Sequence, residues 1–142
     1  MDRRFLGLDY GEKNVGVALS DLSRRIASPH AVLRAEPRRN LLLGIREIVA
    51  AEDVGAIVLG LPLEMSGREG RAAAKARAFA ALLRAEVPGV DVVLADERLT
   101  SGMSERMLVR EFDMSREKRG KIIDKLAARE ILQQALDIMN RE

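Results

Sequence analysis

The chain has 142 residues, none of which is cysteine, and it contains a single histidine, His30. The lack of cysteine excludes thiolate zinc sites, cysteine nucleophiles and disulfide bonds. With one histidine, neither a serine–histidine pair nor a metal site built from several histidines is expected. Carboxylates are therefore the side chains that composition leaves for catalysis.

Aromatic residues are also scarce: one Tyr, three Phe and no Trp, or 3% of the chain. Unpaired bases are usually recognised by stacking on aromatic rings, and few rings are present here. If the chain binds nucleic acid, we therefore expect it to do so through the backbone and shape of its partner.

The charge is nearly balanced, with a net charge of +2 and a pI of about 9.3. Most of the positive charge is arginine, whose planar fork suits phosphate contacts, so the excess points weakly to nucleic acid. Apolar residues make up 47% of the chain, enough for one well-filled domain covering residues 1–142. The first apolar run is interrupted by Asp9, and no run approaches the roughly 18 residues of a membrane span, so we expect a soluble cytoplasmic protein without membrane partners.

Five segments have the composition of strands. Residues 3–9, 14–20 and 26–33 are joined by short turns and predict an antiparallel meander. Residues 54–60 and 90–95 are nearly continuous apolar runs, which is typical of parallel strands covered on both faces.

Helical periodicity separates and follows the last two strands. One helix is predicted from Pro37, a second after a capping box at residues 66–69, a short one near 101–112, and a final one from about 122 to 140. Their apolar faces carry Leu41, Leu42, Ile45, Ile48 and Val49 in the first, and Ala72, Ala76, Phe79, Ala80 and Leu83 in the second. Right-handed crossovers then give an α/β fold with a mixed five-stranded sheet of order 3-2-1-4-5 flanked by helices, an RNase H-like arrangement.

Two acids end predicted strands. Asp9 lies at the topological switch point, where open sheets usually bind their ligands, although it could instead only cap a hairpin turn. Glu97 follows the fifth strand, and its simpler interpretation is a solvated acid paired with Arg98. Strand alternation directs only one of Asp96 and Glu97 inward.

The third acid, Asp124, begins the apolar stripe of the last helix. Asp124, Ala128 and Ile131 share one face with Ala135, so the carboxylate is predicted to point toward the sheet. The alternative is an acid in the first helical turn that complements the helix dipole.

Asp9, Glu97 and Asp124 together would form a costly cluster of negative charge. Two unit charges about 4 Å apart repel by roughly 4 kcal/mol at an effective dielectric near 20. A counter-ion would relieve this repulsion, and oxygen ligands favour Mg²⁺ or Mn²⁺ over zinc. Such an ion can activate water and stabilise a leaving oxygen in phosphodiester hydrolysis.

Basic residues are predicted near the same edge of the sheet. Arg68, Arg71 and Lys75 lie on or before the first turns of the second helix, and a second group precedes Asp124. Each charge alone is most simply solvated surface, but their shared location predicts a track for phosphates. The predicted nucleic-acid-binding residues are Lys13, Arg68, Arg71, Lys75, Arg98, Arg116, Lys118, Arg119 and Lys121.

Four segments resemble the YqgF family of Holliday junction resolvases, also called pre-16S rRNA nucleases (RuvX). They occur in the order and spacing of that family and span nearly the whole chain: residues 9–21 (DYGEKNVGVALSD), residues 58–62 (VLGLP) with Gly67, residues 96–100 (DERLT), and Ile123-Asp124 with Ala127-Ala128.

The resemblance implies an RNase H-like fold, a metal-dependent nuclease, and Asp9, Glu97 and Asp124 as its acidic triad. It also assigns Gly60, Leu61 and Pro62 to the Gly-Leu-Pro loop of the family. Asn14 stands where the family often has Arg or Ser, and Lys125 where Ser commonly follows the last acid.

The leading hypothesis is a Mg²⁺- or Mn²⁺-dependent endonuclease of structured nucleic acid, with precursor ends of 16S ribosomal RNA as the substrate that the resemblance implies. The second candidate substrate is branched DNA in the form of a four-way junction. Resolving a junction takes two cuts, so a homodimer is an alternative to a monomer. Two other classes compete: an ATPase of the actin and sugar-kinase type, which would need a second such domain, and a non-catalytic RNA-binding module of ribosome assembly.

Overall fold

The structure is a computed structural model, and it describes residues 3–96 and 116–141, with the side chains of residues 116–119 left out. The short helix predicted near 101–112 lies outside this part. Within the described residues, none of the helices is long and apolar enough to cross a membrane.

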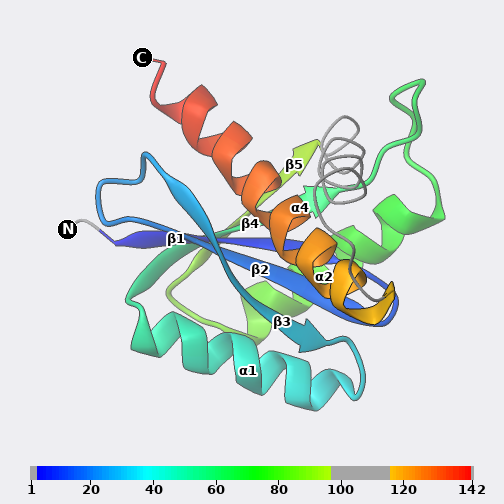
Figure 1. The fold of residues 1–142 in the computed structure, drawn as a ribbon, viewed down its shortest axis with the longest axis horizontal. Coiled ribbons are helices and arrows are strands. Elements are labelled where there is room, and N and C mark those ends of the chain that lie inside the picture. The colour runs from blue at the N-terminus through cyan, green and yellow to red at the C-terminus, as the bar shows by residue number, and fades with distance from the viewer. Residues whose placement is uncertain (1–2, 97–115, 142) are drawn as a thin grey trace.

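One five-stranded sheet forms the centre of the molecule, in the order β3-β2-β1-β4-β5 (Figure 1). Its first three strands form the predicted antiparallel meander, and β4 and β5 run parallel to β1. The strands are β1 (Arg4–Tyr10), β2 (Asn14–Ser20), β3 (Ala27–Arg34), β4 (Val54–Leu61) and β5 (Asp91–Asp96). The predicted RNase H-like order is therefore confirmed.

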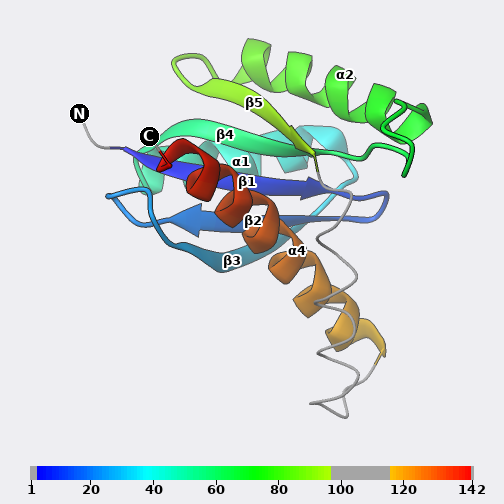
Figure 2. The same cartoon turned by 90° about the horizontal axis from the view of Figure 1, so that it is seen from above.

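Three described helices cover the sheet: α1 (Arg38–Ala51), α2 (Arg71–Glu86) and α4 (Arg116–Met139). Figure 1 shows the sheet between α4 and α1, and Figure 2 shows α4 crossing in front of the strands with α2 alongside β5. One buried cluster lies under α1 and α2 and includes Leu6, Leu8 and Leu59, and a second lies under α4 and includes Val58 and Leu132. Val58 and Leu59, successive residues of β4, thus face different helices, as strand alternation requires.

Helix α4 lies close to the sheet because glycines face it. A Cβ added to Gly7 would lie 2.7 Å from the Cβ of Leu132 and 2.9 Å from the carbonyl oxygen of Ala128. Such distances are far below ordinary van der Waals contact, so only glycine permits this approach. The sheet-facing stripe predicted for this helix is confirmed, since Ala128, Ile131 and Ala135 are all buried.

One predicted helix start and one predicted helix cap are wrong. Helix α4 begins at Arg116, six residues before the predicted start, because the polar residues ahead of Asp124 continue the helix. Helix α2 begins at Arg71 after Gly70, without a side-chain cap. The expected capping box fails because Glu69 is bound instead by Arg77, whose guanidinium donates two hydrogen bonds of 2.6 Å.

The buried face of α2 differs by one position from the prediction. Ala73 is fully buried, whereas Ala72 is exposed. The other predicted residues of this face are buried. On α1, Leu41 and Ile45 are buried, and the other three predicted residues, Leu42, Ile48 and Val49, pack at the edge of the same cluster.

Candidate active site

Asp9 lies near the carboxyl end of β1, on the face that α4 covers. Gly7 contacts α4 directly, and residues two apart on a strand point to the same face. Leu8 and Tyr10, on either side of Asp9, belong to the cluster under α1 and α2. Asp9 is half-buried, so its carboxylate sits at the margin between α4 and solvent.

Gly16 brings Asp9 and Asp124 together. Gly16 is the residue of β2 directly opposite Asp9, and directly opposed residues share a face of an antiparallel pair. A Cβ on Gly16 would overlap the backbone carbonyl of Asp124, so α4 touches the sheet at this point. The two acids that lie 115 positions apart in sequence (124 − 9) are thus neighbours across one glycine.

Asp124 is held by a strand as well as by its helix. The Asn14 side chain, at the start of β2, forms a hydrogen bond with the Asp124 carboxylate. Burial raises the pKa of Asp124 above its ordinary value, and the Asn14 hydrogen bond opposes that rise by favouring the charged form. Burial thus disfavours the charged form of this half-buried carboxylate, and the Asn14 hydrogen bond compensates that cost only in part.

The helix-dipole interpretation of Asp124 is wrong. Because α4 begins at Arg116, Asp124 lies more than two turns inside the helix. The favourable effect of the dipole on an acid is confined to the first turn. Its position is explained instead by the contact with Gly16 and by Asn14.

Glu97 and Arg98 lie outside the described residues, so the predicted triad is described for two of its three members. Among the residues that the structure describes, no group of three or more His, Cys, Asp or Glu could hold a metal ion. The strand that leads to Glu97 is informative: Ala95 packs in the cluster under α4, so alternation turns the exposed Asp96 toward the opposite face.

The donor set fits a hard divalent cation. Asp9 and Asp124 offer carboxylate oxygens only, which Mg²⁺ and Mn²⁺ prefer, and both lie at a solvent margin from which an ion can enter. The incompletely compensated charge of Asp124 is a second point of fit, because a cation would stabilise it.

The predicted basic residues fall into separate groups. Arg71 and Lys75 line one cavity together with Gly11 and Glu12 of the β1–β2 turn. Lys13 and Arg68 are exposed in neighbouring turns and do not line this cavity. Lys121 is exposed on α4, whose first turns carry Arg116, Lys118 and Arg119.

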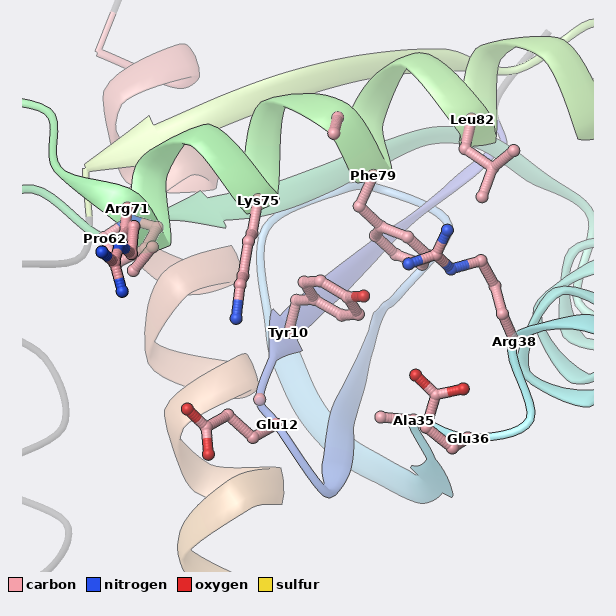
Figure 3. Close-up of a pocket in the computed structure, with 13 residues that line it drawn as sticks. Tyr10, Glu12, Ala35, Glu36, Arg38, Pro62, Arg71, Lys75, Phe79 and Leu82 are labelled. Atoms are coloured by element: carbon pink, nitrogen blue, oxygen red, sulfur yellow. The ribbon is translucent and has the colours of Figure 1, made fainter.

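The cavity just mentioned lies on the other side of the sheet from Asp124, between α2 and the start of α1 (Figure 3). Sequence patterns did not single out three of its lining residues, Tyr10, Arg38 and Phe79, as functional. They also marked Asn14 only as a departure from a family pattern. The signal available was position in the sequence, since Tyr10 follows Asp9 directly and Asn14 lies two residues before Gly16, which pairs with Asp9.

Solved structures define the class of fold. RuvC from T. thermophilus in complex with a Holliday junction substrate superposes with a TM-score of 0.54 at 16% identity, covering 97% of this chain and 96% of that chain. The Fowlpox virus resolvase in complex with Holliday junction DNA gives a TM-score of 0.57 at 10% identity, covering 97% and 99%. At these identities the likeness establishes the RNase H-like fold of the RuvC-like resolvases.

The sequence comparisons then define the family. A family model described as RuvX, Holliday junction resolvase, matches residues 3–138, and the chain belongs to this family. A protein of Gluconacetobacter diazotrophicus, named "Putative pre-16S rRNA nuclease", is 46% identical over 96% of this chain and 88% of its own length. Proteins of the same name from Endomicrobium trichonymphae and Caldanaerobacter subterraneus are 44% and 46% identical over 98% and 94% of this chain and 99% and 96% of theirs.

Proposed function

We propose that the chain is a divalent-metal-dependent endonuclease that hydrolyses phosphodiester bonds of structured RNA, acting on the 5′ end of the precursor of 16S ribosomal RNA. The observation that supports this proposal is the position of Gly16, which pairs with Asp9 on the sheet and lies against the backbone of Asp124. The names of relatives at 44–46% identity support the substrate.

Asp9 and Asp124 are the proposed catalytic ligands, with Glu97 as the third. When bound, Mg²⁺ or Mn²⁺ would activate a water molecule and stabilise the leaving oxygen of the cleaved bond. Asn14 orients the carboxylate of Asp124 through its hydrogen bond. The choice of Glu97 over Asp96 is supported by Ala95, which faces α4 two positions before Glu97.

Arginine and lysine side chains would hold the RNA backbone beside these acids. The proposed set is Lys13, Arg68, Arg71, Lys75, Arg98, Arg116, Lys118, Arg119 and Lys121. The exposure of Lys13, Arg68, Arg71, Lys75 and Lys121 supports this role, because phosphate contacts need accessible cations.

Cleavage of end-labelled precursor RNA tests the proposal. The wild-type protein should cut with Mg²⁺ or Mn²⁺ and not with EDTA, and Asp9→Asn should lose at least about 100-fold in rate because one carboxylate ligand is gone. Asp91→Asn is the matched control: it removes an exposed acid at the amino end of β5, far along the sheet, and should cut like wild type. Equal rates for Asp9→Asn and wild type would refute the metal site, and intact RNA under every condition would favour the non-catalytic binding module.

Four-way DNA junctions are the second candidate substrate, favoured by the description of the RuvX family model. Resolution requires two paired cuts, so we expect a homodimer if this is the activity. The same assay with a labelled junction, combined with sedimentation of the protein, separates the two. Paired nicks by a dimer would support resolution, and faster cleavage of RNA by a monomer would exclude it.

A further inference from the structure

The cavity beside Tyr10 has the size and lining of a ligand site. Its volume is about 860 Å³, within the usual range of roughly 300–1,000 Å³ for pockets that bind small molecules. It opens between α2, the β1–β2 turn and the start of α1, on the face opposite Asp124 (Figure 3).

Three cations of the cavity have no bound partner in the described part of the chain. Arg71 and Lys75 lie one turn apart on α2, and Arg38 begins α1; all three are exposed, and none makes an ion pair or a side-chain hydrogen bond there. Arginines of α2 outside the cavity differ. Arg77 is bound to Glu69, and Arg84 donates a 2.8 Å hydrogen bond to the carbonyl oxygen of Val92. Within the described residues, the cations of this helix that have no partner are thus the ones that line the cavity.

A pair of stacked rings forms the apolar wall. The rings of Tyr10 and Phe79 have centroids 4.2 Å apart and an interplanar angle of 1°. Phe79 is buried, whereas Tyr10 is only half-buried. Figure 3 shows the Tyr10 ring between Phe79 and the segment that carries Ala35 and Glu36, so Phe79 covers one face and the other face looks into the cavity.

The acids of the cavity lie on the side away from α2. Glu12 and Glu36 line it, and Figure 3 shows Glu12 below Lys75 and Glu36 next to Ala35, both farther from α2 than the Tyr10 ring. A cavity that offers cations, a ring and carboxylates matches the parts of a nucleotide. The phosphate is an anion, the base stacks, and amino and hydroxyl groups of base and ribose donate hydrogen bonds.

We propose that this cavity binds one unpaired nucleotide of the substrate strand, with its base on the open face of Tyr10 and its phosphate on Arg71 and Lys75. The inference rests on the proposed nuclease function and deepens it. Tyr10 directly follows Asp9, so the end of β1 presents the acid on one face and the ring on the other. A strand passing this end can place one phosphate at Asp9 and a neighbouring nucleotide in the cavity.

Tyrosine fluorescence reports on the site directly, because Tyr10 is the only tyrosine and the chain has no tryptophan. Wild-type protein is titrated in EDTA, so that nothing is cut, with single-stranded oligouridylate, the matching RNA duplex, and uridine monophosphate. We expect saturable quenching by the single strand at the lowest concentration, after correction for absorption with free tyrosine amide. No quenching by the single strand, or equal or tighter binding of the duplex or the mononucleotide, would overturn the proposal.

Anisotropy of a labelled single strand then tests the residues. Tyr10→Leu should weaken binding roughly 5- to 100-fold, the range for removal of a base–ring stack. The pair Arg71→Ala and Lys75→Ala, in a helix already rich in alanine, should reduce the salt dependence of binding by a slope of roughly 0.7 for each phosphate that is no longer neutralised. Thermal unfolding confirms that each variant is folded.

Arg38→Ala and Arg39→Ala form the matched control, since they remove the same charge from adjacent residues of α1 and only Arg38 lines the cavity. Arg38→Ala should weaken binding and Arg39→Ala should not. Equal effects of the two variants would show that binding depends only on net charge, and would contradict a nucleotide site in the cavity. These measurements need no metal, so they can fail while Asp9→Asn still abolishes cleavage, and the reverse also holds.

Discussion

Asn14 donates a hydrogen bond to Asp124, and this contact joins the first hairpin to the last helix. Residues that orient a metal-binding carboxylate typically change metal affinity 10- to 100-fold when they are removed. Asn14 is therefore a positioning residue in the proposed site, acting through Asp124.

Asn14→Ala should raise the concentration of Mn²⁺ needed for half-maximal cleavage by roughly 10-fold or more, because Asp124 loses its hydrogen-bond donor. The rate at saturating Mn²⁺ should fall less than the affinity. Titration of Mn²⁺ in the cleavage assay measures both quantities. An unchanged Mn²⁺ requirement in a folded variant would exclude a positioning role for Asn14.

Asp21 closes the β2–β3 turn. Its carboxylate accepts hydrogen bonds from the Ser23 hydroxyl at 2.6 Å and from the backbone N–H groups of Arg25 and Ile26 at 2.9 and 3.1 Å. These bonds, the one from Ser23 first, lower the pKa of Asp21 to about 2. The stabilisation is thus complete above the ordinary pKa of 3.8 and disappears as the pH falls toward 2.

Asp21→Asn should lower the free energy of unfolding at pH 7, and the difference from wild type should shrink as the pH falls from about 4 to 2. Urea unfolding at several pH values measures this difference. A loss of stability that stays constant down to pH 2 would show that the charge of Asp21 plays no part.

The position of a single residue was predictable where that residue belongs to a strand or helix pattern in the sequence. Asp9 and Asp124 follow from the strand order and the apolar stripe, and the structure brings them together. The bond from Asn14 could not be predicted, because it depends on the depth at which α4 crosses β2. The stack of Tyr10 on Phe79 likewise depends on how α2 packs over β1.

Helix α4 is the element on which the site depends. Its position is set by two glycines, Gly7 and Gly16, which leave no side chain between helix and sheet. Gly120, in the same helix, differs: a Cβ there would meet no described atom within 4 Å outside its own helical turn.

Gly16→Ala should lower the free energy of unfolding by about 3 kcal/mol and displace Asp124, since the new Cβ would overlap the Asp124 carbonyl. Gly120→Ala should instead raise it by about 0.5–1 kcal/mol, because alanine is the better helix former. Chemical unfolding compares the two. If Gly16→Ala is as stable as wild type, α4 does not lie on β2 as described.

The elements themselves were largely predictable. All five strands follow from apolar runs bounded by turn residues, and α1 follows from its periodicity. The cap of α2 and the start of α4 were not predictable. The Glu69–Arg77 pair replaces the expected cap of α2, and charged residues extend α4 to Arg116.

In the whole molecule, two different surfaces lie at the carboxyl end of β1, the central strand, one on each face of the sheet. Asp9 faces α4, with Asp124, while Tyr10 faces α2 and the cavity. The scarcity of aromatic residues predicted that nucleic acid would be recognised through its backbone and shape alone. The one tyrosine, however, lies beside the proposed metal site. Composition could not reveal this, because a count of rings carries no position.

A ligand that binds only the folded protein stabilises the whole molecule, by about 2.7 kcal/mol at 100 times its dissociation constant. Mn²⁺ at such concentrations should therefore raise the midpoint of thermal unfolding of the wild-type protein. The rise should be about half as large or smaller in Asp9→Asn, if that variant binds Mn²⁺ at least about 10-fold more weakly, and it should be kept in full in Asp91→Asn. Equal rises in all three proteins would place the stabilising ion elsewhere.

The most direct measurement counts Mn²⁺ ions bound by the protein, using the electron paramagnetic resonance signal of free Mn²⁺. The wild-type protein should take up Mn²⁺ saturably, and both Asp9→Asn and Asp124→Asn should bind it at least about 10-fold more weakly while remaining folded. If both variants bind Mn²⁺ as the wild type does, the carboxylates that meet across Gly16 do not form a metal site.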